Sequence, residues 1–429
     1  MAKWSRYNSL VANDDGSTLF FNARTGALIR LSPERCRQIG ERPAEIPQDY
    51  LDFLLQQGFL VGDNVDEIQL IANAHAEARN ERRVFSATIE LTEACNFRCV
   101  YCYQTHAPED LEDRAAEKII RYLSRKMEQV HHLHVNWFGG EPLIRLEMMT
   151  SISRRLAEAA RIHRCSFSQF VTTNGYFVTP LFAEKLAELG IENVQITVDG
   201  DENSHDQLRV LASGKGTYKK VLAGCENVVS AGMELMVRIN VNRWNADRID
   251  YLLSDLASRG ISPANTVIHA VRAIDHGNCS QEISSLMFSN SEFAEEWVRI
   301  LGVIAEYGFG LPTLAPRAYN CSFDLRQTVM IGRDGNIRHC SSSDGRLAEL
   351  TDAGEETNAT PLCNVIKSRT PLDDPVCREC KHLPMCMGGC SYLQELGREK
   401  CNPERYVLPE LVRLTARQAE IVTSGELTR

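Results

Sequence analysis

Strand-like and helix-like segments alternate along the middle of this 429-residue chain, and no other feature restricts its fold as much. Six apolar runs of strand length are separated by amphipathic runs of helical length, a pattern typical of parallel βα units. The expected strands are Ala87–Leu91, His132–Phe138, Phe167–Thr173, Asn193–Val198, Leu235–Val241 and Thr266–Val271. The expected helices are Arg114–Gln129, Leu146–Ala160, Pro180–Leu189, Tyr218–Ala231 and Ala246–Ser258. A closed barrel of this type has eight strands, so we expect an α/β fold with a partial (β/α)6 TIM-type barrel and a site at the carboxyl ends of its strands.

The barrel pattern divides the chain into three expected domains. Residues 1–80 hold three short extended runs and two short helices, which predict a winged-helix-like module followed by a helical linker. Residues 81–310 form the expected barrel. Residues 311–429 form a cysteine-rich domain, since eight of the fifteen cysteines lie between Cys321 and Cys401.

Composition excludes several classes of partner. The formal charge of -10 is spread without long basic runs, so we expect no nucleic-acid partner. No segment approaches the ~18–20 apolar residues of a membrane helix, and the start has no apolar signal-peptide core, so we expect a cytoplasmic protein without a membrane partner. Structural disulfides are rare in that compartment, and tight cysteine clusters there indicate metal sites.

The first cysteine cluster directly follows the first expected barrel strand. Cys95, Cys99 and Cys102 have the spacing CxxxCxxC. Three thiolates can bind three irons of a cubane cluster and leave the fourth iron open for a small ligand. A structural zinc site would need a fourth protein ligand, either His106 or a distant residue.

This cluster, in its strand-then-loop context, resembles that of radical S-adenosylmethionine (SAM) enzymes. Other barrel motifs extend the resemblance, which implies that Gly139, Gly140, Glu141 and Pro142 form the segment that binds the amino group of SAM. Tyr101 matches the aromatic position near the adenine. The segments at later strand ends, where the family contacts ribose, methionine carboxylate or substrate, contain Thr173, Asn174, Asp199 and Arg238.

The resemblance implies a reaction as well as a binding site. In the family, SAM bound at the open iron is cleaved by an electron from the reduced cluster, and the resulting 5'-deoxyadenosyl radical abstracts hydrogen from carbon. The cofactor performs this step while the protein supplies orientation and excludes water. The three cysteines are therefore expected to be ligands, and no residue is assigned as a catalytic acid, base or nucleophile.

The second cysteine array is similar to the seven-cysteine SPASM domain. That resemblance implies two auxiliary 4Fe-4S clusters, three clusters in all. It assigns the first auxiliary cluster to Cys321, Cys340 and Cys390, and the second to Cys377, Cys380, Cys386 and Cys401. Cys363 either completes the first cluster or leaves an iron open for a substrate thiolate; a zinc ribbon is the alternative for the segment from Cys377 to Cys390.

We interpret the chain as an oxidoreductase that matures a ribosomally made (RiPP) precursor peptide through an oxidative thioether or carbon-carbon crosslink. The N-terminal module resembles a leader-recognition element, and a flavodoxin or ferredoxin is the expected reductant. Ser341 stands where sulfatase-maturing relatives have an Asp base, which argues against formylglycine formation. Modification of a protein side chain, peptide epimerisation and a purely electron-transferring iron-sulfur protein remain alternatives.

Overall fold

The structure is a computed structural model that describes residues 2–13, 15–39, 43, 46–343, 345–357, 359–361, 363 and 368–422. The chain divides into two compact units. The barrel unit comprises residues 80–310 and 325–368, and the terminal unit comprises residues 1–79, 311–324 and 369–429. Among the described residues, no helix is both long enough and apolar enough to span a bilayer.

The barrel unit is built on a nine-stranded sheet whose order is β13-β12-β10-β9-β8-β6-β14-β15-β16. Six neighbouring strands are parallel, and these confirm the six that the sequence predicts. They are β6 (Val84–Glu90), β8 (His132–Phe138), β9 (Ser166–Thr173), β10 (Ile191–Thr197), β12 (Glu234–Val241) and β13 (Thr266–Arg272). Within the described residues the order starts at β13 and ends at β16, so the barrel is partial and not closed.

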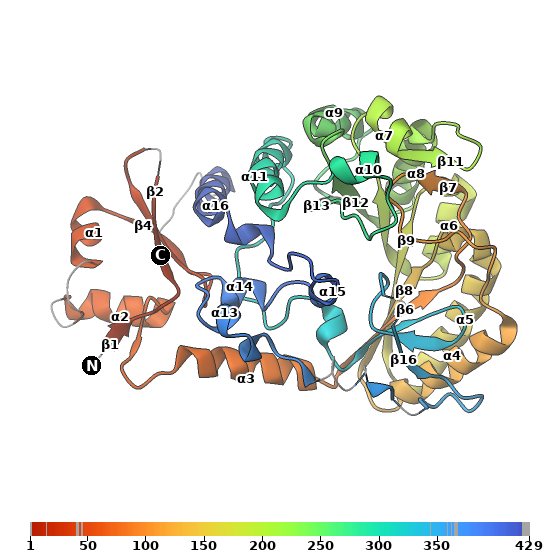
Figure 1. Cartoon of the computed structure of the whole chain (residues 1–429), viewed down its shortest axis with the longest axis horizontal. Coiled ribbons are helices and arrows are strands. Elements are labelled where there is room, and N and C mark those ends of the chain that lie inside the picture. Colours follow the sequence, from red (N-terminus) through yellow and green to blue (C-terminus); the bar gives the residue numbers. More distant parts are fainter. Residues whose placement is uncertain are drawn as a thin grey trace. The chain divides into compact units, whose positions relative to one another are not determined.

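The helices between these strands also agree with the predicted pattern. In Figure 1, α4, α5 and α6 lie along the outer side of the parallel strands. The helices of the barrel unit are α4 (Asp113–Met127), α5 (Leu146–His163), α6 (Pro180–Glu188), α7 (Glu202–Leu208), α8 (Tyr218–Ser230), α9 (Ile249–Ser258), α10 (Gln281–Ser285) and α11 (Asn290–Glu306). Short 3-10 turns precede α5 and α9, namely η2 (Pro142–Arg145) and η3 (Ala246–Arg248). Local capping supports these boundaries, as at α11, where Ser289 and Glu292 form a capping box.

Apolar and polar side chains alternate along each strand, so that apolar residues pack in the core and polar residues face the inside of the barrel. On β8, Leu133, Val135 and Trp137 are fully buried and face the helices. Each such apolar side chain contributes about 1.5–3 kcal/mol when it leaves water. The intervening His134 points to the other face, where its Nδ1 lies 2.8 Å from Ser168 Oγ of β9. The inner face of the barrel is thus polar, and the stability of the unit comes mainly from the outer layer.

Three further strands extend the parallel sheet from the cysteine-rich part of the sequence. They are β14 (Thr328–Ile331), which pairs in parallel with β6, and the antiparallel β15 (Asn336–Arg338) and β16 (Arg346–Glu349). A buried ion network holds this addition in place, since the carboxylate of Glu90 lies 3.3 Å from the guanidinium groups of both Arg333 and Arg338. The sequence did not predict this pairing.

The terminal unit contains a three-stranded antiparallel sheet formed by β2 (Asn8–Ala12), β3 (Thr18–Asn22) and β4 (Leu28–Leu31). These strands match the three predicted extended runs. Phe20 and Phe59 stack at 4.3 Å in the core of this sheet. A second, two-stranded sheet pairs β1 (Ala2–Trp4) with β5 (Leu60–Gly62).

Helices complete the terminal unit, and most of those in its C-terminal part are a single turn long. They are α1 (Pro33–Ile39), α2 (Gln48–Gln57), α3 (Glu67–Asn80), η4 (Ser322–Asp324), η5 (Pro371–Asp373), α13 (Pro375–Arg378), α14 (Leu383–Cys386), α15 (Ser391–Glu395), η6 (Pro403–Arg405) and α16 (Leu408–Val422). Helix α16 packs on β2 and β3. The first and last segments of the chain therefore share one unit.

Candidate functional site

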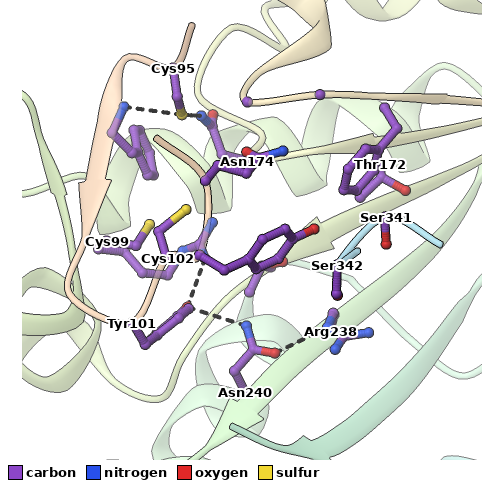
Figure 2. A pocket seen from close by; sticks show the side chains of 18 of the residues that line it. Cys95, Cys99, Tyr101, Cys102, Thr172, Asn174, Arg238, Asn240, Ser341 and Ser342 are labelled. Atoms are coloured by element: carbon purple, nitrogen blue, oxygen red, sulfur yellow. Dashed lines mark hydrogen bonds between the residues drawn. The ribbon is translucent and has the colours of Figure 1, made fainter. Parts of the chain in front are cut away.

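The three cysteines of the first cluster line one pocket at the carboxyl ends of the parallel strands. The pocket has a volume of about 330 Å³, within the range of small-molecule sites. In Figure 2 the cysteines lie on one side of this pocket, and Arg238, Ser341 and Ser342 lie on the other. This edge of the barrel is where the sequence predicts the site.

A short strand within the cysteine loop holds the thiols in place. β7 (Phe97–Cys99) pairs with β11 (Arg209–Leu211), and the side chain of Phe97 is fully buried. Burial raises the pKa of Cys95 to about 11 and that of Cys99 to about 12. Both are therefore protonated thiols at neutral pH when no metal is bound, and metal binding must displace their protons.

Three thiols in one open pocket are a donor set suited to an iron-sulfur cluster with one free iron. Asn174 supports this set, because its Nδ2 donates to the sulfur of Cys95 at 3.8 Å and to Asn96 Oδ1 at 2.8 Å. Among the described residues, no group of three or more His, Cys, Asp or Glu side chains is arranged to hold a single metal ion. The assignment of the cysteines as ligands therefore rests on their shared pocket.

Gly139 and Gly140 line the pocket and also dock the cysteine loop. A Cβ atom on Gly139 would overlap the carbonyl oxygen of Thr92, and one on Gly140 would overlap those of Glu93 and Ala94. The close approach allows Gly140 N to donate to Thr92 O at 2.8 Å and Glu141 N to donate to Ala94 O at 2.9 Å. Glycine at these two positions brings the end of β8 against the residues just before Cys95.

Glu141 is fully buried and does not line the pocket. Its Oε1 accepts hydrogen bonds from Leu143 N at 3.0 Å and Thr173 Oγ1 at 2.7 Å, and its Oε2 accepts from Asn174 N at 2.7 Å. Burial raises the pKa of Glu141, and these three donors oppose that shift. The carboxylate connects the end of β8 to the end of β9, while the buried Pro142 starts the turn η2.

Asp199 is a second predicted site residue that lies behind the pocket wall. It is fully buried and accepts a hydrogen bond from Tyr101 Oη with Oδ2 and one from Asn240 N at 2.7 Å with Oδ1. Tyr101 Oη also accepts from Arg209 Nη1 at 2.8 Å and from Asn240 Nδ2 at 3.2 Å. The acid thus orients Tyr101, which lines the pocket beside the cysteines.

Arg209 is a pocket residue that the sequence did not indicate. It lies opposite Cys99 in the β7–β11 pair and is buried against the ring of Phe97. The thiol of Cys99, the phenol of Tyr101 and the carboxyl of Asp199 raise its pKa well above the usual value, against the opposing effect of burial. Its position in an antiparallel pair that joins two distant loops leaves no periodic signal in the sequence.

Three further residues that the sequence analysis selected at the ends of strands line the pocket. Thr173, Asn174 and Arg238 line the pocket, and so does Arg272 of β13. Burial lowers the pKa of Arg238. No Asp or Glu is among the described residues that line the pocket, so its walls carry an excess of positive charge suited to an anionic ligand group.

A hydroxyl cluster occupies the pocket wall opposite the cysteines. Tyr103, Ser341 and Ser342 line this wall, and burial raises the pKa of Tyr103 while hydrogen bonds from the two serines lower it. The ring of His276 lies 4.7 Å from that of Tyr103. These groups can donate and accept hydrogen bonds without carrying a charge.

The eight C-terminal cysteines are divided between the two units. Cys340 and Cys363 belong to the barrel unit, and the terminal unit contains Cys321, Cys377, Cys380, Cys386, Cys390 and Cys401. None of the fifteen cysteines forms a disulfide.

Within the terminal unit, some neighbouring cysteines raise one another's pKa. Cys390 contributes to the raised pKa of Cys321, about 11, although burial is the main cause. Cys401 and Cys377 likewise contribute to that of Cys386, also about 11 and mainly due to burial. Arg405 Nη1 donates to Cys401 Sγ at 3.0 Å.

Cys363 is 2% exposed and lies in a short segment whose neighbours 362 and 364–367 are outside the described residues. Its backbone N donates to Thr360 O at 3.0 Å. Its burial is compatible with both alternatives, a cluster ligand and an apolar packing residue.

Comparisons with known proteins agree with this geometry. Residues 89–256 match the model of the radical SAM superfamily. Mycofactocin maturase MftC of Mycolicibacterium smegmatis is 26% identical over 316 residues, which cover 71% of this chain and 77% of that protein. Sporulation killing factor maturation protein SkfB of Bacillus subtilis is 25% identical over 215 residues, covering 50% of this chain and 48% of that protein.

Two solved structures share the fold. The structure of anSMEcpe with bound AdoMet is 16% identical, covers 80% of this chain and 99% of that chain, and superposes with a TM-score of 0.59. Streptococcus suis SuiB bound to precursor peptide SuiA is 14% identical, covers 94% of this chain and 98% of that chain, and gives a TM-score of 0.50. Residues 89–256 therefore match a radical SAM domain, and the curated proteins to which the chain is similar include maturases.

Proposed function

We propose that this protein is a peptide maturase that binds SAM and a 4Fe-4S cluster in the described pocket and installs an oxidative crosslink, thioether or carbon-carbon, in a ribosomally made precursor. The observation that carries the proposal is the convergence of Cys95, Cys99 and Cys102 with Arg238 in one pocket at the strand ends. When bound, the cluster and SAM supply a 5'-deoxyadenosyl radical that can take hydrogen from a carbon atom. The protein's own side chains have to hold and shield these groups.

Each part of the pocket has a distinct task in this proposal. The three thiolates bind three irons, and the excess positive charge near Arg238 attracts the carboxylate of SAM. The buried ring of Phe97 and the close packing of Gly139 and Gly140 against the loop exclude water from behind the cluster. Tyr103, Ser341 and Ser342 offer uncharged hydrogen-bonding groups to a peptide substrate.

Two auxiliary clusters complete the proposed machinery, giving three 4Fe-4S clusters in all. We assign Cys321, Cys340 and Cys390 to the first, with Cys363 as a candidate fourth ligand, and the four remaining SPASM cysteines to the second. The coupling of Cys321 with Cys390 and of Cys386 with Cys401 supports these groups. A substrate radical that ends as a closed-shell crosslink must lose one electron, and clusters held by these cysteines would supply the redox capacity for that loss.

The pocket favours a crosslink over formylglycine formation. Ser341 stands at the position of the base in sulfatase-maturing relatives, and it lines the pocket together with Ser342. A serine hydroxyl is a far weaker base than a carboxylate, and none of the described lining residues is acidic.

The remaining functional assignments are also part of the proposal. Residues 1–80 recognise the leader, residues 81–310 generate the radical, and residues 311–429 carry the auxiliary clusters. A flavodoxin or ferredoxin supplies electrons, and the protein works in the cytoplasm without nucleic-acid or membrane partners.

The test is anaerobic incubation with dithionite, SAM and the short peptide encoded beside the gene, followed by mass spectrometry. We expect release of 5'-deoxyadenosine and a peptide that has lost two hydrogen atoms. A product whose mass is unchanged in ordinary water, but which contains one deuterium when the reaction is run in heavy water, would instead establish epimerisation. If no 5'-deoxyadenosine forms, the protein is an electron-transfer protein and the proposal is wrong.

A further inference from the structure

Two histidines and two serines form a continuous hydrogen-bonded chain on the inner face of the barrel, near the amino ends of β8 and β9. His134 Nδ1 lies 2.8 Å from Ser168 Oγ, and the same oxygen lies 2.8 Å from His132 Nε2. His132 Nδ1 in turn lies 2.8 Å from the Oγ of Ser166, the first residue of β9. None of these four residues is among those that line the pocket at the carboxyl ends of the strands.

The direction of each hydrogen bond in this chain follows from Ser166. Its hydroxyl donates to the carbonyl oxygen of His131 at 2.9 Å, so it accepts from His132, whose Nδ1 must carry the proton. The Nε2 of a neutral His132 is then an acceptor, and Ser168 donates to it. Because a hydroxyl has one proton, Ser168 must accept from His134 Nδ1. Every donor in the chain therefore points from His134 towards Ser166, which is exposed.

The inner end of the chain is able to accept a proton. In this tautomer the Nε2 of His134 is unprotonated, and it forms no hydrogen bond with another described residue. Burial lowers the pKa of His134, and the adjacent His132 lowers it further, so the imidazole is neutral at neutral pH. The residues in register on either side, Ser86 of β6 and Ser168 of β9, carry no charge. A neutral imidazole at the end of a uniformly oriented chain can take up one proton while the other end releases another.

Polar side chains also lead from the pocket to His134. Thr172 lines the pocket, and its Oγ1 donates to Asn136 Oδ1 at 3.3 Å. Asn136 and His134 are alternate residues of β8, so they lie about 6.6 Å apart along the strand. An interval of this length between polar groups is one that a single water molecule bridges. Since none of the described lining residues is acidic, no carboxylate of the lining competes for a proton released there.

We propose that His134, Ser168, His132 and Ser166 form a proton relay that carries a proton from the substrate to the surface at the amino ends of the strands. The inference rests on the proposed function, in which the precursor loses two hydrogen atoms. One leaves as a hydrogen atom to the 5'-deoxyadenosyl radical. The other leaves as an electron, which passes to an oxidised iron-sulfur cluster, and a proton, which enters the relay.

Each step of the relay moves one proton by one hydrogen bond. Water passes the substrate proton to His134 Nε2, and the proton on His134 Nδ1 moves to Ser168. The hydroxyl proton of Ser168 moves to His132 Nε2, and the proton on His132 Nδ1 moves to Ser166. Ser166 releases its own proton to bulk water, so one proton enters and one leaves.

Nitrogen-15 NMR of the histidine rings tests the polarity of the chain without turnover. In the full-length protein with oxidised clusters and labelled histidine, His132 and His134 should both be Nδ1–H tautomers, although the Nε2–H tautomer is the commoner one in water. Ser166→Ala removes the acceptor of His132 Nδ1, so both rings should change to the Nε2–H tautomer. Ser86→Ala, beside His134 on β6, is the matched control and should change neither ring. An Nε2–H tautomer of either ring in the wild type, or a change confined to His132 in Ser166→Ala, would overturn the inference.

Chemical rescue tests whether the chain carries a proton during turnover. The quantity measured is the amount of crosslinked peptide per 5'-deoxyadenosine released, with the precursor peptide encoded beside the gene. His134→Ala should lower this ratio about a hundredfold, and added imidazole, which takes the place of the missing ring, should restore most of it. Ser168→Ala, which interrupts the chain and retains both histidines, should also lower the ratio, whereas Ser86→Ala should not. The wild type is measured with the same imidazole, because imidazole also binds iron.

The outcomes separate the relay from the proposed function. A wild-type ratio in both His134→Ala and Ser168→Ala would overturn the relay and leave the proposed function intact. A lowered ratio in His134→Ala that imidazole does not raise would also overturn the relay, since His134 would then only support the structure. If the wild type forms no crosslink, the proposed function fails and the relay fails with it.

Discussion

Glu141 lies beside the proposed SAM site, but its carboxylate is buried and accepts hydrogen bonds from the protein. Replacing Glu141 with Gln therefore tests whether this carboxylate supports the fold of the site or binds SAM directly. Three donors surround the carboxylate, namely Leu143 N, Thr173 Oγ1 and Asn174 N. In the less costly orientation, the Gln oxygen takes the place of Oε1 and keeps two of these bonds. Its amide nitrogen then faces Asn174 N, donor against donor.

The expected loss of stability follows from these contacts. One buried donor without a partner costs about 1–3 kcal/mol, and two charge-assisted bonds that become neutral lose about 1 kcal/mol in total. We therefore expect Glu141→Gln to destabilise the barrel unit by about 2–4 kcal/mol. Asn174 should shift with the lost bond and loosen its contact with Cys95, so SAM affinity should fall as a secondary effect.

The assay must report on the barrel unit, because a chain of two units need not unfold in one step. Urea denaturation of the metal-free protein, followed by pulsed hydrogen exchange of β8 and β9, isolates the relevant transition. Thr173→Val and the double variant complete a cycle, which should show a coupling of about 0.5–3 kcal/mol between Glu141 and Thr173. Glu147→Gln, an exposed change in the first turn of α5, is the control.

The reasoning would be refuted if Glu141→Gln left β8 and β9 as stable as in the wild type but abolished SAM binding. In that case the carboxylate must face the ligand. A coupling energy of zero between Glu141 and Thr173 would support the same conclusion. A carboxylate that faced the ligand would not form the hydrogen bond with the Thr173 hydroxyl.

Two other variants test the cysteine loop. Replacing Cys95, Cys99 and Cys102 with Ala should remove about four of about twelve irons per chain and stop 5'-deoxyadenosine release, as measured by iron analysis and chromatography; undiminished release would contradict the ligand assignment. Gly140→Ala should place a Cβ against the carbonyls of Glu93 and Ala94, displace the loop and reduce iron incorporation at this site, whereas Gly302→Ala, which meets no atom within 4 Å, should have no effect.

The local pattern of the barrel was predictable because each strand and helix there carries its own periodicity. Ser166–Thr173 and Tyr218–Ser230 each differ from the predicted segment by one residue at one end. Pairings between distant segments were not predictable in this way. β14 joins β6, and β1 joins β5, through main-chain hydrogen bonds that do not constrain side-chain pattern.

The candidate site shows the same division between local and long-range information. Strand-end placement correctly brought Thr173, Asn174 and Arg238 to the pocket lining. It could not show that the carboxylates of Glu141 and Asp199 are buried behind the pocket lining, because the direction of a side chain at a strand end depends on which distant donors are present. Arg209 was missed because its position opposite Cys99 arises only when two loops pair.

Cys363 bears directly on what kind of product the protein makes. A first auxiliary cluster with three protein ligands has an iron that can bind a substrate thiolate, and this favours a thioether product. A fourth ligand from Cys363 closes that iron, and a cluster that only relays electrons favours a carbon-carbon crosslink.

The structure anchors the segment that carries Cys363 to the barrel unit. Thr360 N donates to Leu347 O at 2.8 Å and Thr360 Oγ1 donates to Arg346 O at 3.0 Å, which attaches the start of the segment to β16. Cys340, an assigned ligand of the first auxiliary cluster, follows β15 in the same unit. Cys363 N in turn donates to Thr360 O at 3.0 Å, which connects Cys363 to this anchored residue.

We therefore predict that Cys363→Ala changes the electron paramagnetic resonance spectrum and the midpoint potential of an auxiliary cluster, because ligand identity sets both. Cys225→Ala is the matched control, since Cys225 is also fully buried but lies on α8, outside both cysteine motifs. If the two cysteines only pack, both Cys363→Ala and Cys225→Ala should lower the stability of the protein and leave the spectra of the auxiliary clusters unchanged. If Cys363→Ala leaves the auxiliary spectra unaltered, Cys363 is a packing residue, and a cysteine-containing precursor should then shift the wild-type cluster signal when it binds.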